Sequence, residues 1–278
     1  MLLTSPNAVT ERGSDTPTDF LITKEYRRFE EFCNACRRDR YIGLCYGMPG
    51  VGKTLSARYY ARWDLLADTD PLDFNTPLPP EVAECRTLFY TPEVTNSPRQ
   101  IKDHIETGKV LLRGIEIKRE RAHDGPSTYV GDKDSCELVI VDEADRLKMP
   151  SLEQLRDMYD RDNFGLILVG MPGLEKRLAR YPQLYSRIGF AHAFRPLSNE
   201  EMIFVLEHHW KKIGSSLQPN DFTDQEAVAT VIRVTAGNFR LLQRLFSQIE
   251  RILKLNDLKT ITKEVVETAR DCLVIGTN

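Results

Sequence analysis

The clearest chemical signal in the sequence is a glycine-rich segment that matches the pattern G-x-x-x-x-G-K-[ST] at every required position. Glycines in such a loop let backbone N–H groups turn towards a phosphate, and the N-terminus of the following helix adds positive potential. The amine of Lys53 would reach the β- and γ-phosphates of ATP, and the hydroxyl of Thr54 would ligate Mg²⁺. The motif predicts a nucleotide site made of Gly47, Met48, Pro49, Gly50, Val51, Gly52, Lys53, Thr54 and Leu55.

A second motif delivers two carboxylates directly after the apolar run 138–141. Such a run is typical of a parallel strand that is covered on both faces, and ligands bind at the carboxyl ends of these strands. Asp142 is suited to hold Mg²⁺ through its water shell, because Mg²⁺ keeps several waters and binds few carboxylates. Glu143 is suited to orient or deprotonate the attacking water. The pair predicts hydrolysis of the bound ATP, with a solvated acidic turn as the alternative.

Arginines further along the chain are candidates for stabilising the charge that phosphoryl transfer builds on the phosphate oxygens, because a guanidinium is planar and permanently charged. Arg187 precedes the last predicted strand, and Arg240 opens a predicted helix after Gly-Asn-Phe. Spacing alone does not single them out, since other arginines lie close by and ordinary surface positions are the alternative. The competing residues are Arg177, Arg180 and Arg195.

The elements that must position these groups alternate between strand and helix. Strands are predicted at 41–46, 86–90, 138–141, 165–169 and 190–194, and helices at 24–38, 54–66, 98–113, 150–159 and 173–180. This alternation favours an α/β fold with a parallel sheet flanked by helices. Surface loops are predicted at 67–84 and 114–135, the second as a loop or short hairpin. Beyond residue 196 only helical periodicity appears, at 200–213, 224–235, 239–255 and 262–273.

The chain therefore divides into three expected parts. Residues 1–22 are rich in Ser, Thr, Asp and Pro and are expected to form a flexible arm. Residues 23–196 form the predicted α/β nucleotide-binding domain, and residues 197–278 a small all-helical lid domain. Cys33 and Cys36 form a C-x-x-C pair on one predicted helix face. A lone pair supplies half of a zinc shell, so we interpret both as small core residues.

Composition and hydropathy argue against a polycationic protein and against a membrane-spanning or secreted one. The formal net charge over 278 residues is −3, so the whole molecule is not a polycation and nucleic-acid binding would need a local patch. No apolar run approaches the length of a membrane span, and no signal peptide opens the sequence. We therefore expect a cytoplasmic protein without a membrane partner.

The order of the features resembles that of the AAA+ ATPases: a P-loop, a D-E pair, a later arginine, a helical lid and Gly-x-x-Arg. More narrowly, the chain is similar to the TnsC/TniB/MuB group of transposition regulators, in the stretches 41–54, 141–147, 168–174 and 237–242. The resemblance implies an AAA+ P-loop fold and an ATP-dependent ring or helical filament on duplex DNA. It also implies recruitment of a DDE-type transposase, a target-selector protein as a further partner, and release on ATP hydrolysis.

Roles for single residues follow from the resemblance as well. Arg187 matches the arginine finger, which acts on ATP in the neighbouring subunit, and Arg240 matches the sensor-2 arginine of the lid. The sensor-1 position falls at Gly170 and Met171, where neither side chain is polar. This departure predicts slow hydrolysis that DNA or a partner stimulates. The alternatives are a replication-initiator-like or secretion-type AAA+ ATPase, and a nucleotide-gated scaffold with little hydrolysis.

A basic segment at 99–121 is the candidate contact with DNA, because filament-forming members of the resembled group line their pore from this part of the sheet. It carries seven cations against four carboxylates. Phosphate contacts from Lys and Arg give sequence-independent, salt-sensitive binding, which suits a marker of many target sites. A solvated helix and loop is the alternative. The candidate residues are Arg99, Lys102, Lys109, Arg113, Lys118, Arg119 and Arg121.

Overall fold

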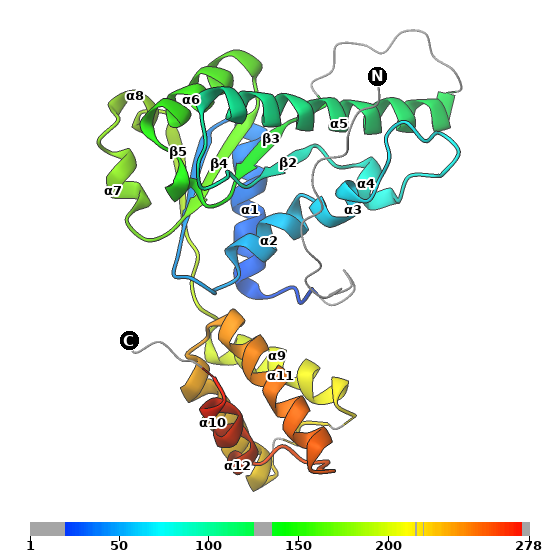
Figure 1. Cartoon of the computed structure of the whole chain (residues 1–278), viewed down its shortest axis with the longest axis vertical. Helices are drawn as coiled ribbons and strands as arrows, with labels where there is room; N and C mark the ends of the chain where they lie inside the picture. The colour runs from blue at the N-terminus through cyan, green and yellow to red at the C-terminus, as the bar shows by residue number, and fades with distance from the viewer. Residues whose placement is uncertain (1–19, 125–134, 215, 219, 274–278) are drawn as a thin grey trace.

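The computed structural model describes residues 20–124, 135–214, 216–218 and 220–273 (Figure 1). An α/β part occupies the upper portion of Figure 1, and a bundle of helices lies below it. The chain passes between the two through the segment that follows the last strand. The contacts between the parts lie at the end of the sheet where the P-loop is found, as described below.

A five-stranded parallel sheet forms the centre of the α/β part, in the order β2-β3-β4-β1-β5. The strands are β1 (Ile42–Tyr46), β2 (Thr87–Tyr90), β3 (Leu138–Val141), β4 (Gly165–Gly170) and β5 (Ile188–Ala193). All residues of β3 and β4 are buried, as expected for strands covered on both faces, whereas the edge strand β5 is partly exposed. The predicted strands and the parallel sheet are confirmed. Because the strands are parallel, the segments that follow β1 and β3 meet at one edge.

Two layers of helices cover the sheet. The helices α1 (Lys24–Asp39) and α2 (Lys53–Tyr60) pack on one face, where Leu138 and Ile140 point. The helices α5 (Pro98–Asp124) and α6 (Met149–Asp162) pack on the other face, against Val139 and Val141. The alternation of β3 side chains between two cores follows from the period of two along a strand. Cys33 and Cys36 of α1 are fully buried in the first core, as predicted.

Short helices complete the α/β part: α3 (Trp63–Ala67), α4 (Pro80–Ala83), α7 (Leu174–Leu178), α8 (Pro182–Tyr185) and the 3₁₀ turn η2 (Ala144–Arg146). The prediction of one helix over 54–66 is wrong, because α2 and α3 are separate. Arg62 between them is left-handed, with φ 51°. Its guanidinium lies over the Tyr59 ring, 4.6 Å from the centroid. No glycine marks this break, so the sequence did not indicate it.

The predicted loop or hairpin at 114–135 is also wrong in its first half, because α5 continues to Asp124. Gly114 lies inside this helix and allows close packing. A Cβ atom at this position would lie 2.7 Å from Cβ of Pro71, in the loop that follows α3. Leu112 and Ile115 on either side are fully buried. Residues 125–134 lie outside the described residues.

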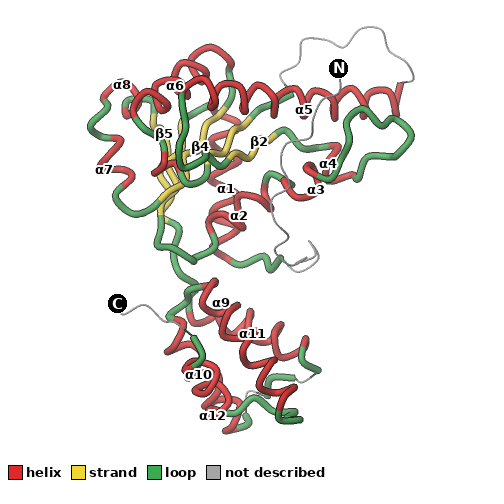
Figure 2. Tube along the Cα trace, viewed as in Figure 1, coloured by secondary structure: helices red, strands yellow, loops and turns green. Residues whose placement is uncertain are grey.

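The lower part of the molecule contains only helices among its described residues, as Figure 2 shows. They are α9 (Asn199–Lys212), α10 (Phe222–Thr235), α11 (Phe239–Leu255) and α12 (Lys263–Asp271). Trp210 and Phe246 lie in a hydrophobic core of their own. The side chain of Ser198 caps α9 in a reciprocal capping box with Glu201. The predicted all-helical character is confirmed, and we call this part the lid.

Most of the predicted N-terminal arm, residues 1–19, lies outside the described residues. The described end of that segment is packed: Phe20 stacks on Tyr59 with ring centroids 3.8 Å apart, and Leu21 lies against the lid core. None of the helices in the described part of the chain is long and apolar enough to cross a membrane.

Candidate nucleotide-binding and hydrolysis site

The loop between β1 and α2 is shaped for an anion. Gly50 and Gly52 have φ values of 81° and 111°, in the left-handed region that glycine adopts without strain. Gly52 is the N-cap of α2, and no side chain caps this helix. The first N–H groups of a helix have no partner within the helix, and they carry its positive dipole end. The loop and the start of α2 therefore form a phosphate cradle.

Lys53 is folded back onto this loop. Its ammonium donates hydrogen bonds to the carbonyl oxygens of Gly47 at 2.6 Å and Met48 at 2.9 Å. The residue is 9% exposed, and burial lowers the pKa of its amine. Both acceptors are neutral carbonyls, so a phosphate is a stronger partner for this buried charge.

The metal-binding candidates Thr54 and Asp142 meet across the gap between α2 and β3. The Thr54 hydroxyl donates to Oδ2 of Asp142 at 2.7 Å. Asp142 is 3% exposed, and burial raises the pKa of its carboxyl although the Thr54 hydrogen bond lowers it. A hydroxyl and a carboxylate at this distance are the hard oxygen donors that Mg²⁺ accepts. The donor set therefore fits Mg²⁺.

The side chain of the proposed base Glu143 is half-exposed, and its backbone has the left-handed conformation, with φ 48°. Its carboxylate forms an ion pair with Arg146, one turn later in η2. Arg146 also donates to the carbonyl of Pro92, in the loop after β2, at 2.8 Å. In this arrangement one oxygen of the Glu143 carboxylate is engaged by a guanidinium.

A cavity of about 520 Å³ lies above these groups, and it brings together most of the residues singled out from the sequence. Lys53, Thr54, Asp142, Glu143 and Arg240 all line it. The groups suited to phosphate binding, metal binding and water activation thus share one space with an arginine of the lid. This is the arrangement that phosphoryl transfer to water requires.

The lid touches the P-loop directly. The amide of Asn238 donates to the carbonyl of Pro49, and the backbone N–H of Arg240 donates to the carbonyl of Gly50, both at 2.9 Å. A Cβ atom at position 50 would lie 2.4 Å from Oδ1 of Asn238, so Gly50 is needed for this approach. The P-loop and the start of α11 are therefore joined by direct hydrogen bonds.

Arg187 does not reach the cavity of its own chain. Its backbone carbonyl accepts a hydrogen bond from the N–H of Ile42 at the start of β1, the end of the sheet opposite the P-loop. In Figure 1, α8, which precedes this residue, lies far from the lid. The guanidinium is paired with Asp160 of α6. The competing arginines Arg177, Arg180 and Arg195 do not line the cavity either.

Asp145 is a cavity residue that sequence reasoning missed. Its Oδ2 accepts a hydrogen bond from the N–H of Met171 at 2.7 Å. The same oxygen would lie 2.4 Å from a Cβ atom on Gly170. A carboxylate from η2 therefore occupies the space at the end of β4 where the sequence offered no polar side chain. The acidic run 142–145 was the available signal, since Asp145 follows the predicted base by two positions.

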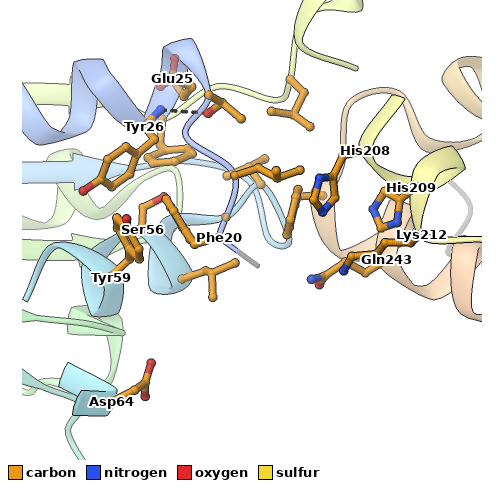
Figure 3. A pocket seen from close by; sticks show the side chains of 18 residues that line it. Phe20, Glu25, Tyr26, Ser56, Tyr59, Asp64, His208, His209, Lys212 and Gln243 are labelled. Carbon is orange, nitrogen blue, oxygen red and sulfur yellow. Dashed lines mark hydrogen bonds between the residues drawn. The ribbon is translucent and has the colours of Figure 1, made fainter. Parts of the chain in front are cut away.

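A second cavity, of about 280 Å³, adjoins the P-loop on the other side and was not predicted (Figure 3). Figure 3 shows Tyr26 and Tyr59 on the α/β side, with His208 and Gln243 on the lid side. Phe20 also lines this cavity, although the sequence placed it in a flexible arm. The walls combine aromatic rings with a few polar groups, as in sites for flat ligands.

The basic segment lies along α5, and most of its cations have partners within the chain. Lys109 forms an ion pair with Asp162. The ammonium of Lys118, a residue 5% exposed, donates to the carbonyl of Asp70 at 3.3 Å. The Arg121 guanidinium lies 4.4 Å from the centroid of the Phe74 ring. These three cations hold neighbouring segments against α5.

Two further arginines of the segment share one carboxylate. Arg113 and Arg119 lie 3.2 and 3.8 Å from the oxygens of Glu116, which is 2% exposed.

The two cations at the start of α5 are exposed to solvent. Arg99 has only a solvent-exposed contact with Asp103 at 3.6 Å, and Lys102 is exposed without an ion pair among the described residues. The structure therefore does not gather the seven candidates on one free surface.

Comparisons with known proteins agree with this geometry. A family model described as AAA domain matches residues 36–178. The chain is 47% identical over 264 residues to a potential ATP-binding protein of Staphylococcus aureus, covering 93% of this chain and 97% of that protein. It is 30% identical over 160 residues to the ATP-dependent target DNA activator B of Escherichia phage Mu, covering 53% of this chain. The match spans 42% of the phage protein's length.

Among solved structures, the chain is similar to the RuvB Holliday junction branch migration motor of Thermotoga maritima. The TM-score is 0.58 at 15% sequence identity, and the match covers 91% of this chain and 70% of that one. At this identity the likeness concerns the fold.

Proposed function

The chain belongs to the AAA family of ATPases. We propose that it is a MuB-like, ATP-dependent regulator of transposition. In this proposal it assembles on duplex DNA in the ATP state, recruits a transposase there, and is released on hydrolysis. The observation that carries the proposal is the single cavity shared by Lys53, Thr54, Asp142 and Glu143 with Arg240 of the lid. The name of the phage Mu relative, an ATP-dependent target DNA activator, supports a role at target DNA.

The residues of the cavity act in a defined way on the nucleotide. Lys53 exchanges the carbonyls of Gly47 and Met48 for the β- and γ-phosphates. Thr54 and Asp142 would hold Mg²⁺, which would supply positive charge beside the phosphates. Glu143 leaves Arg146 and takes a proton from the attacking water.

The second cavity is the proposed site for the adenine base. It lies between Tyr26 and Tyr59 of the α/β part and His208 and Phe239 of the lid. Aromatic and apolar walls bury a flat heterocycle, and the few polar groups orient it. A base held there touches both parts of the molecule, so ATP would fix the lid relative to the sheet.

The proposal includes a homo-oligomer, and the position of Arg187 supports it. This arginine lies at the end of the sheet opposite the cavity, so the proposed finger would act on ATP of a neighbouring subunit. A contact between two different faces of identical subunits is head-to-tail, and such contacts close into rings or continue as helical filaments. Aromatic residues and methionine are enriched at interfaces. Near Arg187, the exposed aromatic side chains are those of Tyr185, two residues earlier, and Tyr41, which precedes the partner of Ile188 in β1. At the opposite end of the sheet, where the cavity lies, the side chains of Met48 and Met171 are exposed.

The proposed DNA contact is the start of α5. The exposed cations of the basic segment are Arg99, Lys102 and Arg121, and of these Arg121 already lies over the Phe74 ring. A surface ion pair such as that of Arg99 with Asp103 is weak and easily replaced by a phosphate. Two contacts per subunit suffice in an assembly, because neighbouring subunits add theirs along the same duplex. Binding of this kind is independent of sequence.

The experiment that tests the proposal is fluorescence anisotropy of labelled duplexes of unrelated sequence, with a slowly hydrolysed ATP analogue or with ADP. We expect tight binding to every duplex with the analogue and little with ADP. Equal binding in both states, or none, would contradict nucleotide control of DNA binding.

A nucleotide-gated scaffold with little hydrolysis is a second candidate, favoured by the apolar Gly170 and Met171 at the end of β4. Phosphate release with and without duplex DNA distinguishes the two functions. We expect slow release that DNA accelerates. A rate that stays at background with DNA and ATP present would favour the scaffold.

A further inference from the structure

The guanidinium of Arg187 is held in place by its own chain. Its Nε lies 2.7 Å from Oδ1 of Asp160, and its Nη2 lies 2.9 Å from Oδ2. Nη1 donates to the backbone carbonyl of Gln183. Two parallel hydrogen bonds to one carboxylate fix the plane of the guanidinium as well as its position.

This arrangement leaves donors free for a second ligand. A guanidinium has five N–H groups. Asp160 takes the Nε–H and one N–H of Nη2, and the Gln183 carbonyl takes one N–H of Nη1. One N–H on each terminal nitrogen remains. These N–H groups are available to phosphate oxygens while the contact with Asp160 persists.

Asp160 is itself braced from within α6. Oδ2 of Asp160 accepts from Nη1 of Arg156 at 2.6 Å, and Nε of Arg156 donates to Glu153 at 2.8 Å. The spacing of i, i+3 and i+7 places these three residues along one face of the helix. The side chains of Asp160 and Arg187 are 30% and 33% exposed, so the pair lies at the surface where a neighbouring subunit can reach it.

We infer that Asp160 is a positioning residue for catalysis in the neighbouring subunit: it orients Arg187 towards the nucleotide of the next protomer and stays bound to it during hydrolysis. The inference rests on the proposed shared site. Pre-ordering a long side chain removes the loss of rotamer freedom that would otherwise oppose its insertion into the neighbouring cavity. Asp160 of one subunit therefore affects the rate of ATP hydrolysis in the cavity of the neighbouring subunit.

Mixing of variant protomers tests this dependence. Lys53→Ala removes nucleotide binding but retains Arg187, whereas Arg187→Ala retains the cavity but lacks the finger. Each variant alone is expected to be inactive. An equimolar mixture with ATP and duplex DNA should regain phosphate release, because the Lys53→Ala protomer supplies Arg187 to the intact cavity of its neighbour. A mixture that stays inactive would contradict the shared site, and the inference about Asp160 with it.

The role of Asp160 is tested by adding Asp160→Ala to one of the two variant protomers in the mixture. Asp160→Ala in the Lys53→Ala protomer, which donates the finger, should lower the recovered rate about tenfold, as expected for a misplaced catalytic group. The same change in the Arg187→Ala protomer should have no effect. Asp157→Ala in the donor is the matched control, because Asp157 lies on the same helix and pairs only with Arg161 among the ion pairs of the described residues. We expect it to leave the rate unchanged.

Three outcomes would overturn the role of Asp160 while the shared site stands. These are an unchanged rate with Asp160→Ala in the donor, an equal loss in donor and acceptor, and a higher rate, which would make Asp160 a restraint on the finger. If Asp160→Ala fails to fold, Asp160→Asn gives the same readout. Its amide accepts at one atom only and cannot reproduce the two parallel bonds.

Discussion

The nucleotide cavity and the basic helix α5 use charged side chains in opposite ways. Around the cavity, Lys53 is bonded to neutral carbonyls, and the Asp142 carboxylate is bonded to a hydroxyl. On α5, Lys109 and Arg119 face carboxylates, and Lys118 is buried against the chain. The charged groups of Lys53 and Asp142 border an open cavity and are available to a ligand, whereas those of Lys109 and Lys118 hold neighbouring segments against α5.

A second contrast separates the two arginines that the sequence suggested for phosphoryl transfer. Arg240 reaches the cavity of its own chain because Asn238 and Gly50 bring the start of α11 against the P-loop. Arg187 lies at the other end of the sheet, paired with Asp160. In the proposed function, Arg240 would act on the nucleotide of its own chain, and Arg187 on the nucleotide of a neighbouring subunit.

The largest expected effect is the loss of ATP hydrolysis when the cavity loses Lys53. Lys53→Ala should lower ATP hydrolysis more than about 100-fold, because it removes a charge that acts on the phosphates in a water-poor site. Phosphate release and calorimetric titration with ATP measure the loss. Lys176→Ala, an exposed lysine on α7, is the control and should leave both unchanged. Hydrolysis that survives in Lys53→Ala would mean that the cavity is not the active site.

Removal of the base should separate binding from chemistry. Glu143→Gln keeps the size of the side chain but cannot take a proton, so we expect hydrolysis to fall about 100-fold or more with little change in ATP affinity. Assemblies on DNA should persist longer than those of the wild type. Dissociation after dilution, followed by anisotropy, measures this lifetime, and a wild-type lifetime would count against Glu143 as the base.

The α5 side of the comparison predicts different results for free and paired cations. Arg99→Ala with Lys102→Ala should weaken DNA binding and reduce the slope of log K against log salt concentration by about 2, since two phosphate contacts are lost. A triple alanine variant of Lys118, Arg119 and Arg121 should mainly lower the melting temperature.

Anisotropy over a range of salt concentrations and thermal unfolding measure these effects on both variants. If the triple variant loses salt dependence while the double variant keeps it, the DNA contact lies at the far end of α5. The distinction between free and paired cations would then fail as a guide to binding.

The smallest expected effect comes from the buried carboxyl of Asp142. Burial raises its pKa in the folded protein above the ordinary value of 3.8. The folded state therefore binds this proton more tightly than the unfolded state, and the stabilisation present at low pH is lost as pH rises through the raised pKa. Without Mg²⁺, Asp142→Asn should remove this pH dependence, a shift of a few degrees in melting temperature at most. A wild-type pH profile in the variant would contradict it.

Local spacing explains why much of the fold could be predicted from the sequence. The strands β1, β3 and β4 are short apolar runs, and the P-loop and the Asp142–Glu143 pair follow two of them directly. The helices of the lid are periodic and begin at side-chain caps such as Ser198 and Asn238. Each of these signals lies within a few residues of the feature that it predicts.

Contacts between distant segments explain what the sequence did not indicate. Gly114 of α5 packs against Pro71, which lies more than forty residues earlier in the chain. The placement of Asp145 beside Met171 joins two loops, and the second cavity is closed by residues from three parts of the chain. Charge counting along 99–121 failed to separate free from paired cations for the same reason.

The central claim is that one nucleotide is enclosed by two subunits, and sedimentation velocity of the full chain tests it most directly. With duplex DNA and a slowly hydrolysed ATP analogue, we expect the wild type to shift from a small species to a large assembly. Arg187→Ala and Lys53→Ala should each prevent that shift. A wild-type protein that sediments as a monomer with every combination of nucleotide and DNA would contradict the claim.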